Sequence, residues 1–289
     1  MSIAPPFEIS PQDLKNEIEA YREARAARLS SKQGWLSLIN KVWLDDGVYR
    51  IGSEEGADVL LPRDRAPRQL ATVTRQGSRV ELAAAPGVVL KSRGEPITSL
   101  ILRSDATNEP DVVTFGSLSF QLLERSSLGE SAGASDFALR VRDGESPLLR
   151  AFRGVDTFPI DPSWRIVARL ERYTSEREVI YEDGDGRPQR YFAPGHALFE
   201  RGGSTYRLEP VYESDRKRLF VLFTDETNRD QTYGAGRFLY TPVPMSDFVV
   251  LDFNKAFNPP CAFTPYAVCP LPSPENRLAL RVEAGEKRP

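Results

Sequence analysis

The residues best suited to chemistry are concentrated in a proline-rich segment near the C-terminus. Positions 258–266 read Asn-Pro-Pro-Cys-Ala-Phe-Thr-Pro-Tyr, and Cys269 and the pair Glu275-Asn276 follow. Proline fixes φ and removes a backbone N–H, so this density of proline predicts a pre-organised loop rather than a helix or strand. Such a loop would hold a thiol, a hydroxyl, a phenol and an amide in defined places, which indicates a site.

Polar residues are also dense in the stretch that leads into this loop. We predict a ligand-binding site formed by Tyr233, Arg237, Asp252, Asn254, Asn258, Thr264, Tyr266 and Asn276. Glycines on either side of Arg237 suggest a bend, and its guanidinium can bind a carboxylate or phosphate through two N–H groups. A buried ion pair between Arg237 and Asp252 is the structural alternative.

Two catalytic arrangements are compatible with these residue types. A carboxylate pair drawn from Asp225, Asp252 and Glu275 can act as acid and base without a histidine. Alternatively, Cys261 can act as a nucleophile with His196, the only histidine of the chain, as its base. The plain alternative is that these polar groups cap turns and tie the loop to the body of the protein.

The spacing of possible metal ligands argues against a metal site. Cys261 and Cys269 are eight positions apart with no second ligand pair, so we do not expect zinc. We expect two buried thiols, with a disulfide that closes the loop as the second option. The acidic turn 182–186 lacks the spacing of an EF-hand and is expected to be a solvated turn. The sequence names no cofactor.

Composition excludes several classes of protein. The chain has 289 residues, of which 40% are hydrophobic and 27% charged, and its net charge is -3. No apolar run approaches the ~20 residues that span a bilayer, and no basic stripe is available for a nucleic acid. The first ten residues do not resemble a secretory signal, so we expect a cytoplasmic protein that binds neither membrane nor nucleic acid.

The hydrophobic pattern predicts a mainly β protein with one N-terminal helix. Ser10 can cap this helix, Pro11 suits its first position, and apolar residues recur at helical spacing to about Ser30. The period then changes to two, which predicts strands at 69–74, 79–82, 117–123, 164–173, 218–223 and 248–253. Gly202-Gly203 predicts a tight hairpin within 197–209.

We expect two packed antiparallel β-sandwich or barrel units. The segment 126–135 is rich in Ser, Gly and Ala and is the best candidate for a linker. The expected organisation is an N-terminal helix in 1–33, a first β unit in 34–125, a linker in 126–135 and a C-terminal β domain in 136–289.

The first β unit resembles a forkhead-associated β-sandwich in three stretches, 47–53, 57–62 and 112–122. That family reads phosphothreonine with an arginine after the glycine and a Ser-x-x-His motif. Here Ser53 follows Gly52 and the unit contains no histidine, so the phosphate-reading groups are missing. The resemblance therefore implies a scaffolding or partner-docking role.

The second half resembles the domain of unknown function 1684 family through four strings. They are Arg-Val-Arg-Asp at 140–143 with Ser-Pro at 146–147, the stretch 158–165, the stretch 232–239, and Leu-Asp-Phe-Asn at 251–254. The family brings no established reaction. The sequence thus predicts an intracellular binding module with a small-molecule or peptide pocket in its C-terminal β domain, and a hydrolase as the alternative.

Overall fold

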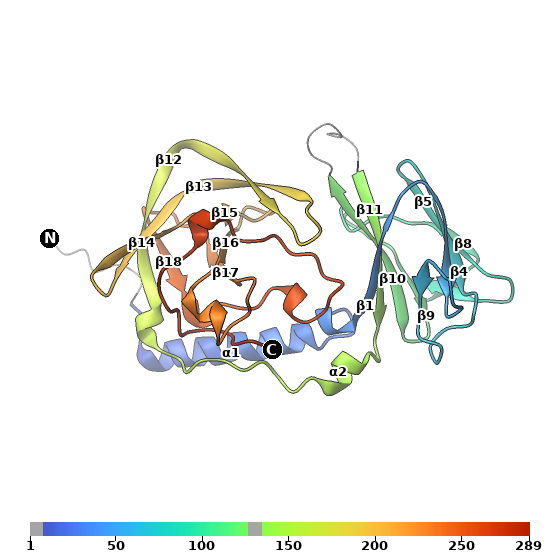
Figure 1. Cartoon of the computed structure of the whole chain (residues 1–289), viewed down its shortest axis with the longest axis horizontal. Coiled ribbons are helices and arrows are strands. Elements are labelled where there is room, and N and C mark those ends of the chain that lie inside the picture. Colours follow the sequence, from blue (N-terminus) through green and yellow to red (C-terminus); the bar gives the residue numbers. More distant parts are fainter. Residues whose placement is uncertain (1–7, 127–134) are drawn as a thin grey trace. The chain divides into compact units, whose positions relative to one another are not determined.

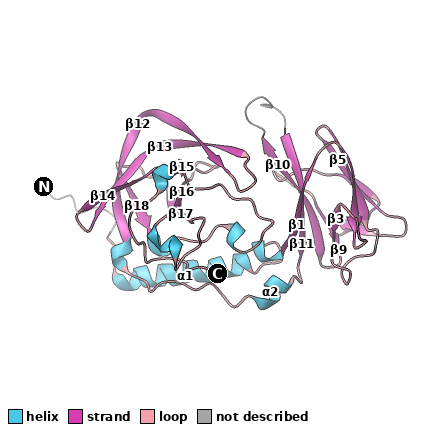
Figure 2. Cartoon of the chain, viewed as in Figure 1, coloured by secondary structure: helices cyan, strands magenta, loops and turns pink. Residues whose placement is uncertain are grey.

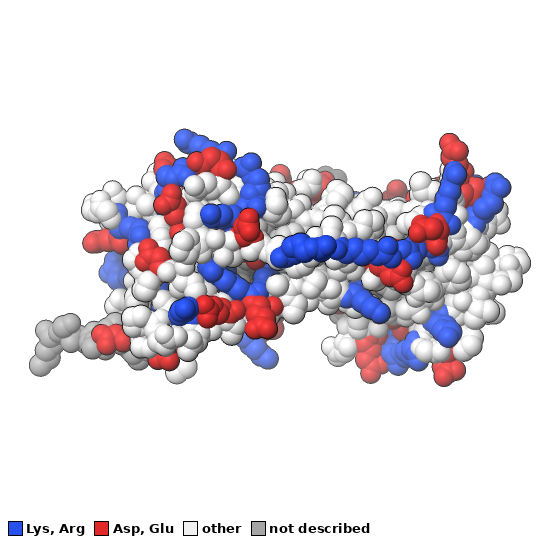
Figure 3. Space-filling view, turned by 90° about the horizontal axis from the view of Figure 1, so that it is seen from below, with Lys and Arg blue, Asp and Glu red and all other residues white. Residues whose placement is uncertain are grey.

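The computed structural model describes residues 8–126 and 135–289, and the chain divides into two compact units. Unit 1 comprises Met1–Ala27 and Arg153–Pro289, and unit 2 comprises Arg28–Phe152. Strands predominate in both units, which confirms the mainly β prediction (Figures 1 and 2). Both acidic and basic side chains occur on the face drawn in Figure 3.

Helix α1 (Pro11–Leu29) is the one long helix among the described residues. The Asp13 N–H donates to the Ser10 hydroxyl over 3.1 Å, so Ser10 caps the helix as predicted. Leu14, Ile18 and Arg25 recur at helical spacing and are buried. The described residues include no helix that is long and apolar enough to cross a membrane.

Unit 2 contains two sheets that share one core. The six-stranded sheet has the order β1-β11-β10-β9-β6-β7 and the five-stranded sheet the order β3-β2-β4-β5-β8. The strands are β1 (Leu38–Leu44), β2 (Gly47–Gly52), β3 (Val59–Leu60), β4 (Ala71–Gln76), β5 (Arg79–Ala84), β6 (Leu90–Ser92), β7 (Glu95–Ile97), β8 (Ser99–Ile101), β9 (Val112–Phe115), β10 (Leu118–Ser126) and β11 (Ser135–Asp143). Val73 of one sheet and Phe120 of the other lie in the same buried cluster, as in a sandwich. A short helix, α2 (Pro147–Ala151), follows.

The expected linker, 126–135, connects neighbouring strands of one sheet. Strands β10 and β11 pair antiparallel as far as Ser126 opposite Ser135. Residues 127–134 of the expected linker lie outside the described residues. The division between the units falls instead at 27/28 and 152/153, because small polar residues suit a strand connection as well as a linker.

Unit 1 contains a four-stranded sheet, β14-β13-β12-β18, and a three-stranded sheet, β15-β16-β17. The strands are β12 (Arg165–Glu182), β13 (Pro188–Arg201), β14 (Ser204–Leu208), β15 (Val211–Tyr212), β16 (Arg218–Phe223), β17 (Arg237–Pro242) and β18 (Phe248–Asp252). Figure 1 shows the long strands β12 and β13 arching together. Gly202 and Gly203, with φ of 58° and 78°, form the predicted tight turn between β13 and β14.

Short 3-10 turns carry four of the residues that the sequence singled out, namely Asn254, Cys261, Glu275 and Asn276. The turns are η1 (Trp35–Ser37) in unit 2 and, in unit 1, η3 (Pro162–Trp164), η4 (Glu226–Arg229), η5 (Phe253–Lys255), η6 (Pro260–Ala262) and η7 (Pro274–Asn276). Turns η1 and η3 precede strands β1 and β12, η4 and η5 follow strands β16 and β18, and η6 and η7 lie in the irregular C-terminal segment. The turns η5 and η7 place the side chains of Asn254 and Asn276.

Candidate functional site

Arg237 and Asp225 form a buried ion pair whose side chains are both 0% exposed. Arg237 Nη2 donates to Asp225 Oδ2 over 2.7 Å and to the Val282 carbonyl over 2.8 Å. Arg237 Nη1 donates to the Ala284 carbonyl over 2.5 Å. Asp225 also accepts from the N–H and the hydroxyl of Thr227. We call Arg237, Asp225 and Thr227 the Arg237 cluster; its polar groups are almost all used internally.

The acid that pairs with Arg237 differs from the predicted partner, Asp252. Asp252 ends β18 and accepts from the N–H and the side-chain amide of Asn254 over 3.2 and 3.0 Å. The Asn254 side chain in turn donates to the Asp161 carbonyl and accepts from the Asp161 N–H. Burial raises the pKa of Asp252, and Arg165 lies 3.5 Å away. These contacts tie β18 to the segment that precedes β12.

Asn258 ties the start of the proline-rich loop to the C-terminal segment. Its N–H donates to Glu286 Oε2 and its side-chain amide donates to the Lys287 carbonyl, both over 2.7 Å. The whole residue is 0% exposed. Asn258 therefore has a structural role that agrees with the plain alternative stated above.

The thiols of the loop are free and adjacent. The Cys261 N–H donates to Cys269 Sγ over 3.3 Å. The hydrogen bond from the Cys269 thiol lowers the pKa of Cys261 to about 7, whereas this bond and burial raise the pKa of Cys269. The Tyr233 hydroxyl donates to the Cys261 carbonyl. Thr264 accepts from the N–H of Tyr266, whose side chain is exposed.

His196 has a different environment from Cys261. Tyr173 Oη lies 3.1 Å from His196 Nε2, and the two rings meet edge to face at 5.3 Å. No hydrogen bond joins His196 to Cys261 in the described part of the chain. The predicted dyad is therefore not formed in this structure.

His196 belongs instead to a charged cluster on the long strands of unit 1. Tyr173 and Arg177 come from β12 and His196 from β13. The Tyr173 hydroxyl donates to Glu209 Oε1 over 2.5 Å, and Arg177 Nη2 lies 2.7 Å from the same oxygen. Arg177 Nη2 also donates to Glu275 Oε2 over 3.1 Å. The Glu209 side chain is 1% exposed, whereas that of Arg177 is 46% exposed, so this cluster opens to solvent on one side.

Tyr181 brings an unpartnered hydroxyl to this cluster. Arg177 and Tyr181 are four residues apart on β12 and so share one face of the strand. Tyr181 is 2% exposed, and its hydroxyl has no hydrogen-bond partner among the described residues. Burial and then the negative charge of Glu209 raise the pKa of Tyr181, which keeps the hydroxyl protonated. We call Tyr173, Arg177, Tyr181, His196, Glu209 and Glu275 the Glu209 cluster.

Asn276 positions the buried carboxylate of this cluster. The Glu209 N–H donates to Asn276 Oδ1 over 2.7 Å, and Asn276 Nδ2 donates back to the Glu209 carbonyl over 3.1 Å. Glu275 precedes Asn276 in η7. One short turn thus fixes the backbone of Glu209 and supplies the second carboxylate.

Sequence reasoning identified only part of the Glu209 cluster. His196, Glu275 and Asn276 were predicted, but Tyr173, Arg177, Tyr181 and Glu209 were not. The available signal was the alternation Arg177-Val179-Tyr181, which sets three side chains on one face of the strand, where Val179 and Tyr181 are buried and Arg177 is exposed. The bulge between Arg172 and Arg177 interrupts that alternation and obscures it.

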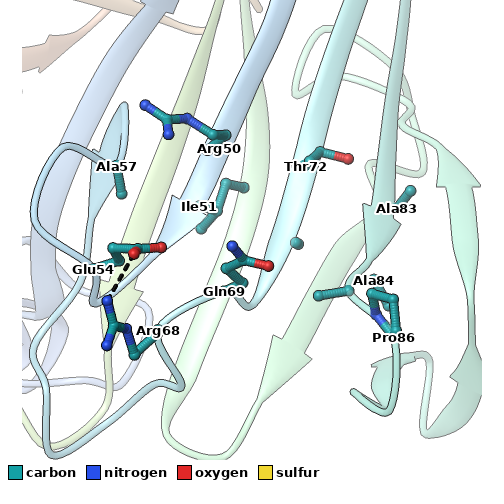
Figure 4. A pocket seen from close by; sticks show the side chains of 12 residues that line it. Arg50, Ile51, Glu54, Ala57, Arg68, Gln69, Thr72, Ala83, Ala84 and Pro86 are labelled. Atoms are coloured by element: carbon teal, nitrogen blue, oxygen red, sulfur yellow. Dashed lines mark hydrogen bonds and ion pairs between the residues drawn. The ribbon is translucent and has the colours of Figure 1, made fainter.

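Unit 2 carries a separate cavity of about 300 Å³ on one face of its five-stranded sheet. Arg50, Thr72 and Ala83 lie opposite one another on β2, β4 and β5 and line it (Figure 4). Much of the remaining lining is alanine and proline. Small side chains leave this space above the sheet.

The cations at this cavity already have partners. Arg68 Nη2 donates to Glu54 Oε1 over 2.8 Å, the contact that is dashed in Figure 4. Arg50 lies 3.5 Å from Asp58 and donates to the Gly56 carbonyl. The hydrogen bond to Arg68 lowers the pKa of Glu54. This cavity offers no unbalanced charge to a ligand.

Comparison with known proteins confirms the predicted resemblance of the second half. Residues 150–287 match the family model described as a protein of unknown function (DUF1684). No curated protein matches the chain.

Two solved structures are similar to parts of the chain. An uncharacterized protein of Haloarcula marismortui, solved by NMR in solution, is 33% identical over 49% of this chain and 80% of its own, with a TM-score of 0.41. The FhaA FHA domain, in complex with the intracellular domain of Rv3910, is 18% identical over 34% of this chain and 84% of its own, with a TM-score of 0.22.

Proposed function

Since residues 150–287 belong to a family of unknown function (DUF1684), we propose a function from the geometry of unit 1: it binds a small organic cation, of the primary amine class, at the Glu209 cluster. We favour a small molecule over a peptide because Glu209 and Tyr181 are buried. A cytoplasmic location, and a scaffolding or partner-docking role for unit 2, belong to the same proposal.

The charge balance of the cluster favours a cation. Glu209 and Glu275 carry two negative charges and Arg177 carries one positive charge, so one negative charge is in excess when His196 is neutral. A protonated amine supplies both the missing charge and N–H donors for carboxylate oxygens. The aromatic face of Tyr173, over which Arg177 already lies at 5.4 Å, suits a cation as well.

The single observation that carries the proposal is the hydroxyl of Tyr181. A buried hydroxyl without a partner costs about 1–3 kcal/mol, so native proteins rarely retain one. Tyr181 lies on the same face of β12 as Arg177, which supports a position of its hydroxyl beside the carboxylates that Arg177 contacts. A bound ammonium would give this oxygen a donor.

Binding of n-butylamine, measured by calorimetry and by the shift in melting temperature, tests the proposal. We expect saturable binding of n-butylamine, none of n-butanol, and loss of binding in Tyr181→Phe and in Glu209→Gln. Tyr206→Phe is the matched control, since among the described residues the Tyr206 hydroxyl bonds to the Ala279 carbonyl of the same unit and to no group of the Glu209 cluster. Equal binding of n-butanol, or full binding by Tyr181→Phe, would refute the amine site.

A divalent metal ion is the second candidate because of one geometric feature. Ligand atoms of His196, Glu209 and Glu275 all lie within 4.8 Å of one another. Imidazole and carboxylate are ligands that zinc accepts, but the Arg177 guanidinium must then leave the carboxylates. If metal is the ligand, Arg177→Ala will bind Zn²⁺ more tightly than the unaltered protein does. If amine is the ligand, Zn²⁺ will bind neither form saturably.

The hydrolase alternative receives no support from the contacts of its proposed residues. Asp225 is held by Arg237, Asp252 by Asn254, and Glu275 by Arg177. An acid–base pair needs two carboxyl groups that face one substrate bond. Here each carboxylate is committed to a different partner.

A further inference from the structure

A second cavity in unit 1 lies against helix α1 and is separate from the Glu209 cluster. It has a volume of about 210 Å³ and is lined by Arg22 and Ala26 of α1, by Val155 and Thr157, and by Ala256. Its walls thus combine the short apolar side chains of Ala26, Val155 and Ala256 with polar groups, which also include Tyr21, Arg25, Asn254 and Glu286. Arg22 is the feature that the rest of the fold does not explain.

The other charged groups at this cavity neutralise each other. Arg25 Nε donates to Glu286 Oε1 over 3.1 Å, and both side chains are about nine-tenths buried. The second oxygen of Glu286 accepts from the Asn258 N–H. Arg25 Nη2 donates to the Asn258 carbonyl. This pair needs no further partner.

Arg22, in contrast, has no carboxylate within 4 Å among the described residues. Its Nη2 donates to the Phe158 carbonyl over 2.9 Å, but its Nε is buried and has no acceptor. Arginine stays protonated in proteins, and the charges of Glu19 and Glu286 act on Arg22 without a direct ion pair, so a cation with one unused N–H belongs to the lining of the cavity. Leaving such a donor unpaired costs at least as much as leaving a neutral donor unpaired.

We propose that this cavity binds a small carboxylate with a short apolar tail, and that Arg22 is its binding cation. A carboxylate oxygen would accept from Arg22 Nε and balance the unpaired charge. The methyl groups of Ala26, Val155 and Ala256 would cover the tail. Arg22 and Arg25 bring two guanidinium groups to this cavity against the one carboxylate of Glu286, and an excess of one positive charge suits a monoanion better than it suits a phosphate dianion.

The test uses sodium butyrate as the probe and the Nε–H signal of Arg22 in a two-dimensional NMR spectrum of the full chain as the readout. We expect butyrate to shift this signal saturably, and butyramide, which has the same shape without the charge, to leave it in place. Calorimetry should register butyrate binding in parallel and at least a tenfold loss of affinity in Arg22→Gln.

Arg28→Gln is the matched control, because Arg28 is an exposed arginine on the same helix. It should bind butyrate like the unaltered chain, and so should Tyr181→Phe, which separates this site from the Glu209 cluster. Equal binding of butyrate by Arg22→Gln, a non-saturating shift, or equal binding of butyramide would overturn the proposal. A melting curve for Arg22→Gln that matches that of Arg28→Gln ensures that lost binding is not lost folding.

Discussion

Two clusters in unit 1 are both built from an arginine and acidic groups, and each keeps one buried donor without a partner among the described residues, Arg237 Nε or the Tyr181 hydroxyl, yet they differ in how far their arginine is exposed to solvent. In the Arg237 cluster both charged side chains are 0% exposed, and the guanidinium donates to one carboxylate and to backbone carbonyls. In the Glu209 cluster the arginine is half exposed, and a buried tyrosine hydroxyl is left without a partner.

This difference separates a structural ion pair from a candidate binding site better than residue type does. A buried pair whose side chains have no exposed surface offers nothing that a ligand can reach, and it holds backbone segments together. A cluster with a half-exposed arginine, an excess charge and a hydroxyl without a partner can still bind a ligand. By this criterion Arg237, one of the eight residues of the predicted ligand-binding site, fits the structural alternative, and Arg177 and Tyr181 are the better candidates.

The largest expected effect is the loss of stability in Arg237→Lys. Lysine keeps the charge but has only three donors at one point, so it cannot reach Asp225 and the carbonyls of Val282 and Ala284 together. We expect the free energy of unfolding to fall by about 3–5 kcal/mol, the range for breaking a buried pair. Urea unfolding monitored by circular dichroism measures it.

Arg177→Lys is the matched comparison for that substitution. Its side chain is 46% exposed and its carboxylate contacts are screened by water, so we expect a change of about 0–1 kcal/mol. If the free energy of unfolding falls by similar amounts in the two variants, the burial of the arginine does not distinguish the two clusters.

An intermediate effect, on the reactivity of a thiol, is expected at Cys261 and Cys269. Cys269 is buried, Cys261 is partly buried, and the Cys261 N–H donates to Cys269 Sγ. The Cys269 thiol lowers the pKa of Cys261 to about 7, so the reactive thiolate forms as the pH rises through that value. The rate of alkylation of Cys261 by iodoacetamide should therefore reach half its maximum near pH 7. In Cys269→Ala the midpoint should move up towards about 8.5, the ordinary value for cysteine. An unchanged midpoint would show that Cys269 does not set the reactivity of Cys261.

The sequence predicted the fold class more completely than the site. Helix α1 and the Gly202-Gly203 hairpin follow from local signals, namely a capping serine and a turn that needs positive φ. The ion-pair partner of Arg237 could not be read locally, since Asp225 and Asp252 are both near it in sequence and only the packing of β17 decides between them.

The Glu209 cluster was hard to predict for a related reason. Tyr173, His196 and Glu209 come from three separate segments and meet only because β12 and β13 pair across a bulge. Single-sequence patterns carry no information on such long-range contacts. The proline-rich segment 258–266 forms neither a strand nor an α-helix, as predicted, and the contacts of Asn258 tie its start to the C-terminal segment.

The smallest effect on stability, and the sharpest test of the comparison, is expected from Tyr181→Phe. This substitution removes only a hydroxyl that has no partner, so the aromatic packing against Tyr191 remains while the cost of the unpaired group disappears. We expect the free energy of unfolding to stay within about 0.5 kcal/mol of the unaltered value or to rise. Tyr173→Phe is the control, because it removes a hydroxyl that donates to Glu209 and should cost about 1.5–3 kcal/mol. If Tyr181→Phe instead destabilises the protein as much as Tyr173→Phe does, the Tyr181 hydroxyl already has a partner in solution, and the Glu209 cluster is as closed as the Arg237 cluster.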